Sequence, residues 1–332
     1  MNTQPVTVWG AGSWGTALAM VLAKHGRPVH LITRNQTTAN QLNAERENAR
    51  YLQGISFPGS LQAIGQEHPD LPGLLQQSFA TILGLPCAAA ETALIRLRDY
   101  NHPVIAANKG INPDSLERVD ELLLRFVGIE RALLLSGPSF AAEVAMGKPT
   151  AITLAANDAA LAKQVSTIFD DDNFRVYTST DLVGVALGGA LKNVIAIAAG
   201  MAEGMHLGHN ALAALITRGI AEISRLATAC GGKSETMSGL SGLGDLLLTC
   251  TGSLSRNRKM GMALASGLSA EKAREYVGQV VEGEKTTTAA VKLAQKHQVE
   301  MPITQMTYAV LQGKATPKDA LKTLMDRPQR DE

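Results

Sequence analysis

Up to about residue 180, the chain alternates between short apolar runs and stretches with helical spacing. Short apolar runs bounded by glycine, proline or polar residues are typical of buried strands. Seven strands are expected on this basis, at residues 6–10, 28–33, 79–85, 103–108, 132–137, 150–156 and 174–178. Between them, segments such as TALAMVLAKHG and SLERVDELLLRFVG carry apolar residues at helical spacing. This alternation predicts an α/β fold with a mainly parallel sheet and helices on both faces.

After Thr180 the strand-like runs cease and the pattern becomes helical to the end of the chain. Helices are expected at residues 181–204, 210–230, 259–268, 270–277, 284–298, 302–313 and 317–326. A chain of 332 residues is long for a single hydrophobic core. We therefore predict two domains, residues 1–180 with the sheet and residues 181–332 with helices alone.

The composition indicates a soluble globular protein. With 18% charged residues and a formal net charge of +1, no general field attracts nucleic acid or an anionic membrane. The three cysteines, Cys87, Cys230 and Cys250, are scattered without a CxxC pair, which suits a reducing compartment. The start MNTQPVTVWG lacks the pattern of a signal peptide, and the apolar stretches of 10 to 15 residues are too short for a bilayer. We expect a cytoplasmic protein that does not insert into membranes.

Three glycines mark the junction between the first expected strand and the helix after it. Gly10, Gly12 and Gly15 form GAGSWG, and a second strand follows about eighteen residues on. In this context the first glycine permits a tight turn, the second lets the backbone approach a pyrophosphate, and the third lets helix and strand pack closely. The motif predicts a Rossmann-type dinucleotide-binding domain, the alternative being a glycine turn that holds no ligand.

Arg34 stands where a domain of this kind selects its cofactor. Enzymes that bind NAD usually carry Asp or Glu at the end of the second strand, whereas here the sequence reads Thr33-Arg34-Asn35. A guanidinium pairs well with a 2′-phosphate. We therefore predict NADPH as the preferred cofactor, with NADH possible, unless Arg34 is simply a solvated residue at a strand end.

Lys192 is the one charged residue of GALKNVIAIAAG, residues 189–200. A lysine in such surroundings either extends its ammonium to water or holds an amine in a dry place for chemistry. Gly188 and Ala196 lie one helical turn either side, and small residues there would leave room for a ligand. A buried lysine can act as a proton carrier near neutral pH.

Three further segments place polar groups at turns in apolar surroundings. Lys109-Gly110 ends one expected strand, and SGPSFAAE at 136–143 follows another. The segment 239–259 sets Asp245 in a glycine-rich stretch before Ser255-Arg256-Asn257. Each segment alone fits ordinary turn chemistry. Together they would suit a small phosphorylated substrate.

The chain resembles the bacterial NAD(P)-dependent glycerol-3-phosphate dehydrogenases from residue 6 to about residue 326. The matching runs are GAGSWGTALA (10–19), NKGI (108–111), LSGPSFAAEVAMGKPTA (135–151), GGALKNVIAIAAG (188–200), NALAALITRGIAE (210–222), GLGDLLLTCT (242–251), SRNR (255–258) and VEG (281–283). The resemblance implies a Rossmann-type domain followed by an all-helical domain of the 6-phosphogluconate dehydrogenase-like kind.

The resemblance also implies roles for individual residues. Lys192 would be the catalytic base of glycerol phosphate oxidation and would give its proton to the alkoxide in the reverse direction. The dinucleotide would be bound by the loop glycines and by Ser13, Trp14, Arg34, Lys109, Ala141, Arg256, Val280 and Glu282. The substrate would be bound by Lys109, Gly137, Ser139, Lys192, Asp245, Ser255, Arg256 and Asn257. Whether Asp245 orients the lysine or accepts from a substrate hydroxyl is open at this point.

The expected reaction is hydride transfer between a nicotinamide and C2 of dihydroxyacetone phosphate, which feeds sn-glycerol 3-phosphate to phospholipid synthesis. We expect a homodimer formed through the helical domain. The rivals are another NADP-dependent reductase of the β-hydroxyacid type and a non-enzymatic NADPH sensor. The chain departs from the family pattern at Cys87, Ser241, His206 and His209. The HxxH spacing of the two histidines has no carboxylate or cysteine companion, so we expect no metal site.

Overall fold

The computed structural model describes residues 4–169 and 171–328, and the chain divides into two compact units. The first unit comprises Met1–Lys109 and Val119–Leu182, and the second comprises Gly110–Arg118 and Val183–Glu332. Each unit has its own cluster of buried apolar side chains. The predicted boundary after residue 180 lies beside the last crossing between the units, whereas the excursion at 110–118 was not anticipated.

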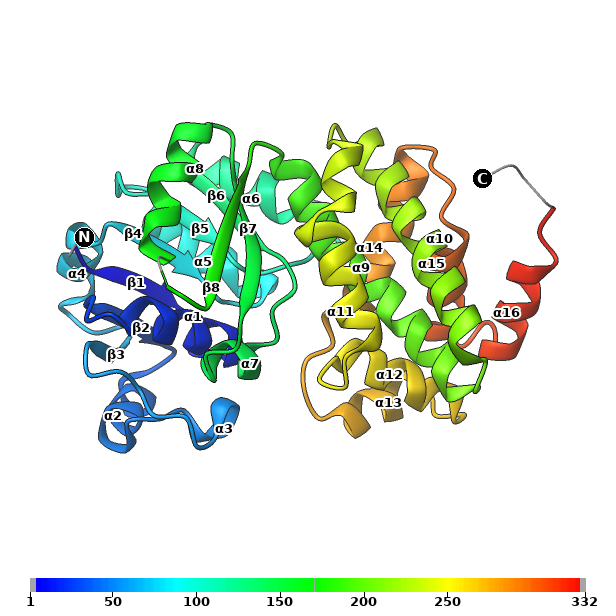
Figure 1. Ribbon diagram of the computed structural model, residues 1–332, viewed down its shortest axis with the longest axis horizontal. Helices are drawn as coiled ribbons and strands as arrows, with labels where there is room; N and C mark the ends of the chain where they lie inside the picture. Colours follow the sequence, from blue (N-terminus) through cyan, green and yellow to red (C-terminus); the bar gives the residue numbers. More distant parts are fainter. Residues whose placement is uncertain (1–3, 170, 329–332) are drawn as a thin grey trace. The chain divides into compact units, whose positions relative to one another are not determined.

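The first unit is built on an eight-stranded sheet with the order β3-β2-β1-β4-β5-β6-β7-β8 (Figure 1). All pairings are parallel except that of β6 with β7. The first six strands follow the order of doubly wound nucleotide-binding folds, which confirms the predicted α/β class. The strands are β1 (Val6–Trp9), β2 (Val29–Thr33), β3 (Leu61–Gly65), β4 (Ala80–Leu83), β5 (Val104–Ala106), β6 (Ala132–Ser136), β7 (Thr150–Ala156) and β8 (Phe174–Ser179).

All seven predicted strands are present, and β3 is the strand that the sequence pattern missed. Its residues LQAIG lie at the edge of the sheet, with Gln62 exposed and only Leu61, Ala63 and Gly65 buried. A run this short, with weak alternation of apolar and polar residues, does not predict a strand by itself. Its pairing with β2 stabilises it as a strand.

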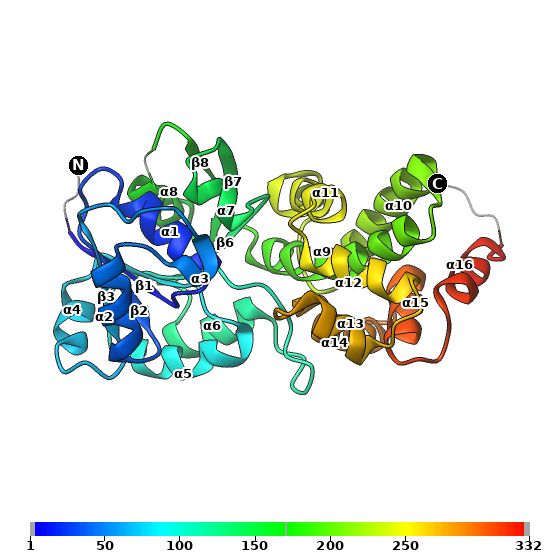
Figure 2. The same cartoon turned by 90° about the horizontal axis from the view of Figure 1, so that it is seen from below.

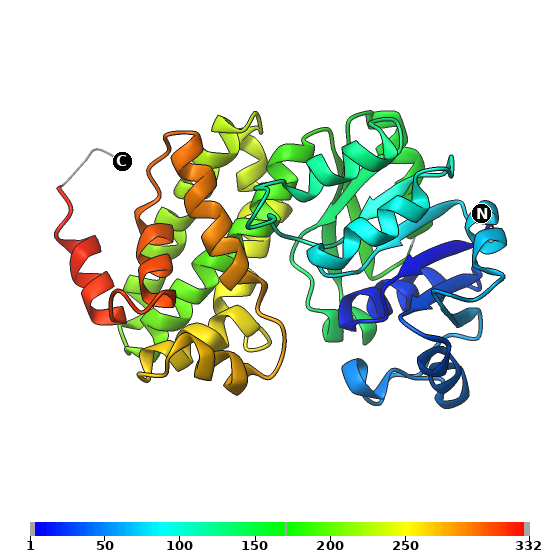
Figure 3. The same ribbon diagram turned by 180° about the vertical axis from the view of Figure 1, so that it is seen from behind.

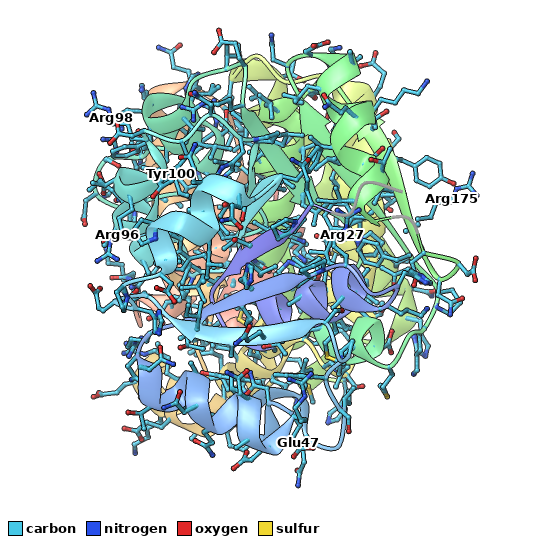
Figure 4. All side chains as sticks on the ribbon, turned by 90° about the vertical axis from the view of Figure 1, so that its left-hand side faces the viewer. Arg27, Glu47, Arg96, Arg98, Tyr100 and Arg175 are labelled. Atoms are coloured by element: carbon cyan, nitrogen blue, oxygen red, sulfur yellow. The ribbon has the colours of Figure 1, made fainter. Side chains whose placement is uncertain are left out.

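At the other edge, β8 presents polar and charged side chains. Arg175 projects from this edge in Figure 4, and its guanidinium lies 5.6 Å from the centre of the Tyr177 ring. A charged outer strand discourages pairing with another chain.

Helices and turns join the strands of the first unit. They are α1 (Ser13–Ala23), α2 (Gln36–Glu45), α3 (Ala49–Leu52), α4 (Leu71–Gln77), α5 (Cys87–Leu97), α6 (Val119–Val127), α7 (Ala141–Ala145), α8 (Ala159–Ser166) and the 3₁₀ turn η1 (Thr167–Phe169). The short helix α3 packs against α1, as Figure 2 shows.

From α9 onward, all the regular elements of the second unit within the described residues are helices. Its elements are α9 (Leu182–Gly204), α10 (Gly208–Ala229), the 3₁₀ helix η2 (Ser234–Ser238), the π-helix η3 (Leu240–Gly244), α11 (Asp245–Thr251), α12 (Arg256–Ala265), α13 (Ala270–Val277), α14 (Glu282–Lys296), α15 (Pro302–Leu311) and α16 (Pro317–Met325). Figure 3 shows α14 and α15 side by side. The seven predicted helices are present, and η2, η3 and α11 were not predicted.

Helix α9 forms the centre of the second unit because it is apolar on all sides. Its 23 residues are long and apolar enough to span a bilayer, which differs from the expectation that every apolar stretch is too short. The reason is that Lys192 and the glycines do not interrupt the helix. Since 94% of the most apolar window is buried inside the structure, α9 has the character of a core helix.

Residues 110–118, which interrupt the first unit in the sequence, pack as part of the second unit. Ile111 belongs to the apolar core of that unit and forms an isolated β-bridge with Arg118. The Lys292 Nζ donates a hydrogen bond to the Pro113 carbonyl at 2.9 Å. Lys109 is therefore the last residue of the first unit before this crossing.

Candidate active site

The glycine loop after β1 has the shape of a dinucleotide cradle. Gly10 has a φ of +117°, and a Cβ there would lie 2.8 Å from the Gly84 carbonyl oxygen. A Cβ at Gly15 would collide with the Gly10 carbonyl, so both residues must be glycine for α1 to pack on the sheet. At Gly12, in contrast, a Cβ would meet nothing within 4 Å. The role predicted for the second glycine, close approach of a ligand to open backbone at a helix N-terminus, therefore fits Gly12.

Arg34 lies directly after β2, where its side chain is exposed. The turn around it is well defined, because the Thr33 Oγ1 donates to the Asn35 carbonyl at 2.7 Å. Asn35 then caps α2 by accepting from the Thr38 N–H at 2.8 Å. The guanidinium is thus carried on a fixed turn with no carboxylate at residues 33–35.

Lys109, Gly137 and Ser139 come together at the carboxyl ends of β5 and β6. The Lys109 Nζ and the Ser139 Oγ both donate to the Gly137 carbonyl, at 3.3 and 3.0 Å. Gly137 has a φ of +148°, and a Cβ there would lie 2.9 Å from the Ile152 Cα. The three predicted residues therefore form one polar cluster in the first unit, and Ala141 begins α7 just after it.

Trp14 lies in the first turn of α1 with its ring packed against the core of the first unit. Its Nε1 atom is buried and has no hydrogen-bond partner among the described residues. Ser13 precedes it as the first residue of the helix. Both residues therefore occupy the helix start next to Gly12, as predicted.

In the second unit, Lys192 is buried and paired. Its residue exposure is 9%, and its Nζ donates to the Oδ1 of Asp245, which is 1% exposed. The alternative of a lysine extended into water is therefore wrong. The Asp245 carboxylate thus makes the contact with the lysine amine that the first of its two predicted roles requires.

The pair is formed because η3 carries Asp245 up to α9. A Cβ at Gly188 would lie 2.5 Å from the Ser241 carbonyl oxygen, so this glycine admits the backbone of η3. The expectation that Gly188 leaves room for a ligand is therefore wrong. Asp245 is the first residue of α11, directly after the π-helix, and such helices frequently occur at functional sites.

One turn further along α11, Thr249 and Cys250 complete the surroundings of the pair. The Thr249 Oγ1 donates to the Asp245 carbonyl at 2.6 Å. Burial raises the pKa of the Cys250 thiol to about 12, although Lys192 opposes the shift. Cys250 therefore stays a neutral thiol beside the pair.

A chain of amides ties the residue after Lys192 to the SRNR run. The Asn257 Nδ2 donates to the Asn193 Oδ1 at 2.8 Å, and the Gly283 N–H donates to the Asn257 Oδ1 at 3.0 Å. Ser255 is the N-cap of α12 and accepts from the Arg258 N–H at 3.2 Å. The first turn of α12 is thus fixed relative to Lys192, with Arg256 exposed.

The far end of α9 is fastened to α12 as well. A Cβ at Gly200 would collide with the Arg258 carbonyl, and one at Gly261 with the Ile197 carbonyl. The Arg258 guanidinium forms two hydrogen bonds to the Glu203 carboxylate, the one from Nε measuring 2.6 Å. Arg258 therefore holds the two helices together, a role distinct from that of the exposed Arg256.

Val280 and Glu282 lie at the start of α14. Val280 is 61% exposed, whereas Glu282 is half-buried. Burial raises the pKa of the Glu282 carboxyl, and the charges of Arg256 and Lys285 oppose this shift. Glu282 is therefore within electrostatic reach of Arg256.

The predicted site residues thus fall into two groups. Those of the first unit are Gly10, Gly12, Ser13, Trp14, Gly15, Arg34, Lys109, Gly137, Ser139 and Ala141. Those of the second unit are Lys192, Asp245, Ser255, Arg256, Asn257, Val280 and Glu282. Sequence reasoning missed Asn193 and Thr249, whose only signal was their spacing from Lys192 and Asp245. Among the described residues, no group of three or more His, Cys, Asp or Glu side chains is arranged to hold a metal ion.

A doubly wound sheet with a dinucleotide cradle, and a helical unit with a buried lysine, are the features of a two-domain nicotinamide-dependent dehydrogenase. Residues 5–162 match the family model described as the N-terminus of NAD-dependent glycerol-3-phosphate dehydrogenase, and residues 181–322 match that of its C-terminus. The chain belongs to the NAD-dependent glycerol-3-phosphate dehydrogenase family. This confirms the resemblance seen in the sequence motifs.

Individual relatives agree with the family assignment. The chain is 45% identical over 329 residues to a glycerol-3-phosphate dehydrogenase (NAD(P)+) of Halorhodospira halophila, with 98% of each chain covered. It resembles the crystal structure of glycerol-3-phosphate dehydrogenase from Coxiella burnetii, with a TM-score of 0.90, 39% identity and coverage of 98% of this chain and 99% of that one. The enzyme from Saccharomyces cerevisiae, at 24% identity and a TM-score of 0.84 over 98% of this chain and 100% of that one, shows the same fold.

Proposed function

We propose that the chain reduces dihydroxyacetone phosphate to sn-glycerol 3-phosphate with NADPH or NADH, and that Lys192 is the general acid–base. The observation that carries the assignment of Lys192 is its burial in an ion pair with Asp245. A buried amine held in one place by a carboxylate is suited to deliver a proton to a single substrate oxygen.

When bound, a reduced nicotinamide would supply the hydride, that is, both electrons of the new C–H bond at C2. The ammonium of Lys192 donates its proton to the C2 oxygen, so that the carbonyl becomes a hydroxyl and the lysine becomes a neutral amine. Water then returns a proton to the amine. Asp245 holds the Nζ in position and stabilises its charged form, which is regenerated at the end of each cycle.

We assign the phosphate of the substrate to the first turn of α12. Arg256 offers an exposed guanidinium there, and a planar fork of donors suits that anion. The Asn257 Nδ2 has two hydrogens, of which one is used by Asn193, so that the other can serve the substrate. Ser255 fixes the start of the helix that carries both. Lys109, Gly137 and Ser139 are proposed as further substrate contacts from the first unit.

The dinucleotide is proposed to lie on the first unit, with its pyrophosphate over Gly12 and the start of α1. Arg34 is the proposed partner of a 2′-phosphate and makes NADPH the preferred cofactor. Ser13, Trp14, Ala141 and Lys109 are the proposed further contacts in this unit, and Arg256, Val280 and Glu282 are those in the second. Residues 1–180 would thus form the dinucleotide-binding domain and residues 181–332 the substrate-binding domain.

Three further statements belong to the proposal. The protein acts in the cytoplasm without inserting into membranes, its product enters glycerophospholipid synthesis, and it forms a homodimer through the helical unit. The burial of α9 supports the first of these, because the one helix long enough to span a bilayer is used as a core.

A spectrophotometric assay tests the reaction. We expect NADPH absorbance to fall when dihydroxyacetone phosphate is added and to remain unchanged with short 2-keto acids that carry a carboxylate in place of the phosphate. Turnover of the keto acids without turnover of dihydroxyacetone phosphate would overturn the proposal in favour of a β-hydroxyacid-type reductase. NADPH binding with no turnover of either would indicate a sensor.

A further inference from the structure

Asn48, a buried residue outside the glycine motif, donates hydrogen bonds to the glycine loop and to the helix after it. Asn48 is 4% exposed, and its Nδ2 donates to the Ala11 carbonyl at 3.0 Å and to the Thr16 Oγ1 at 2.9 Å. Ala11 lies between the first two glycines of the loop, and Thr16 lies in the first turns of α1. One amide thus joins the loop to the helix that follows it.

The segment 46–58 holds this amide next to the glycine loop. Arg46, in a left-handed conformation with a φ of +54°, donates from its guanidinium to the Leu61 and Pro58 carbonyls at 3.0 and 2.6 Å. The Phe57 N–H donates back to the Arg46 carbonyl at 2.6 Å. Hydrogen bonds therefore join the two ends of the segment 46–58. Glu47, the residue before Asn48, shows where this segment lies on the outside of the unit (Figure 4).

Inside this closed segment, Asn48 begins α3. The Asn48 carbonyl accepts from the N–H groups of Tyr51 and Leu52 at 3.0 and 2.8 Å, and Leu52 belongs to the core of the first unit. Both the backbone and the side chain of Asn48 are thereby held. The amide is a fixed donor, and its contact with Ala11 does not depend on a mobile side chain.

The consequence for the loop follows from the geometry of the peptide bond. The Ala11–Gly12 peptide is trans, so its carbonyl and its N–H lie in the peptide plane and point in opposite directions. A donor that holds the Ala11 carbonyl on the Asn48 side therefore turns the Gly12 N–H to the other side. Among the three glycines of the motif, Gly12 is also the one at which a Cβ would meet nothing within 4 Å.

We propose that Asn48 is a positioning residue for the cofactor: it fixes the Ala11–Gly12 peptide so that the Gly12 N–H is presented to the dinucleotide pyrophosphate. The inference rests on the proposed placement of the dinucleotide over Gly12. It assigns the segment 46–58 a task beyond joining β2 to β3. Asn48 acts through the loop backbone and touches neither the substrate nor the reacting atoms.

The test is the affinity for cofactors and cofactor fragments, measured by fluorescence titration and competition. Asn48→Asp keeps the size of the side chain but removes its donor, and Asn48→Ala removes the amide without adding a charge. We expect the Kd of NADPH and of NADH to rise by about ten-fold in both variants, which corresponds to the loss of one net hydrogen bond. Adenosine 2′-phosphate, which has no pyrophosphate, is expected to bind as it does to the wild type.

Asn43→Asp is the matched control. Asn43 exchanges hydrogen bonds of 2.8 Å with the N–H and the carbonyl of Ala63, so this variant also removes an amide donor from a backbone carbonyl, away from the glycine loop. We expect it to leave the Kd of both dinucleotides unchanged. Thermal unfolding of each variant separates a loss of fold from a loss of positioning, and Asn48→Ala remains informative if Asn48→Asp does not fold.

Dinucleotide affinity within two-fold of wild type in folded Asn48→Ala would overturn the proposal while leaving the proposed function intact. An equal loss for adenosine 2′-phosphate would also overturn it, since the damage would then be general. If the wild-type protein binds neither dinucleotide, the proposed function itself fails, which is a separate result.

Discussion

Gly188 of α9 and Ser241 of η3 approach so closely that a Cβ on the glycine would lie 2.5 Å from the serine carbonyl oxygen. This contact sets the distance between the helix that carries Lys192 and the π-helix that leads into Asp245. The close packing of two backbones, made possible by one glycine, therefore underlies the buried ion pair.

The first prediction concerns Gly188→Ala. The added methyl group must push η3 away, so we expect kcat for dihydroxyacetone phosphate reduction to fall by about ten-fold or more, with NADPH affinity unchanged. Steady-state kinetics and a cofactor titration measure the two quantities. Gly73→Ala is the control, because a Cβ there meets nothing within 4 Å. Wild-type kcat in Gly188→Ala would show that the contact does not govern the pair.

Asp245→Asn tests the carboxylate itself. The amide has the same size but no charge to stabilise the ammonium, so we expect kcat to fall by about 10²–10³-fold, within the range of acid–base contributions. The Kd of NADPH should not change, because Asp245 is not among the proposed dinucleotide contacts of either unit. Asp158→Asn, a change at the N-cap of α8, is the control. A kcat within three-fold of wild type would contradict the role given to Asp245.

Arg34→Asp tests cofactor selection. A carboxylate at the end of β2 repels a 2′-phosphate and accepts from a ribose hydroxyl, so kcat/KM should shift from NADPH toward NADH by at least about ten-fold in ratio. Arg98→Asp, which changes an exposed arginine at the end of α5, serves as the control (Figure 4). An unchanged ratio in Arg34→Asp would count against the 2′-phosphate assignment.

The lowered pKa of His102 leads to a prediction about how the free energy of unfolding depends on pH. Burial, followed by the charge of Arg131, lowers the pKa of this ring to about 4, and the ring bonds to the Thr81 Oγ1 at 2.8 Å. The unfolded chain, with an ordinary histidine pKa near 6.5, binds this proton first as pH falls. The contribution of His102 to stability is therefore complete above about pH 6.5 and is lost as pH falls toward 4.

After allowance for solvent screening at this partly exposed ring, that contribution is on the order of 2 kcal/mol. Denaturant unfolding of wild type and His102→Gln between pH 7 and pH 4 measures it. We expect a flatter pH profile in the variant, while His297→Gln, a change at the C-cap of α14, should leave the profile as it is in the wild type. Parallel profiles for wild type and His102→Gln would refute the assignment.

The sequence pattern predicted what depends on local periodicity. Strands such as Thr150–Ala156 and the helix Leu182–Gly204 are long and apolar enough to be recognised by themselves. The edge strand Leu61–Gly65 and the π-helix Leu240–Gly244 were missed, because partners distant in the chain stabilise them: β2 for the strand, and Gly188 for the π-helix.

The residues of the candidate site also fall into those that the sequence pattern reveals and those that it does not. Lys192 and the loop glycines stand out as residues whose chemistry does not fit a plain core or turn. Asn193 and Asn48 do not, since their importance lies in contacts with residues 64 and 37 positions away in the chain. Spacing alone cannot reveal such contacts.

The central claim is that the buried amine of Lys192 delivers the proton. The most direct test is kcat of Lys192→Ala with dihydroxyacetone phosphate and saturating NADPH, with NADPH binding measured on the same preparation. We predict that turnover is abolished and that the Kd of NADPH stays within two-fold of wild type. A variant that binds NADPH normally and keeps more than a few per cent of the wild-type rate would contradict the claim.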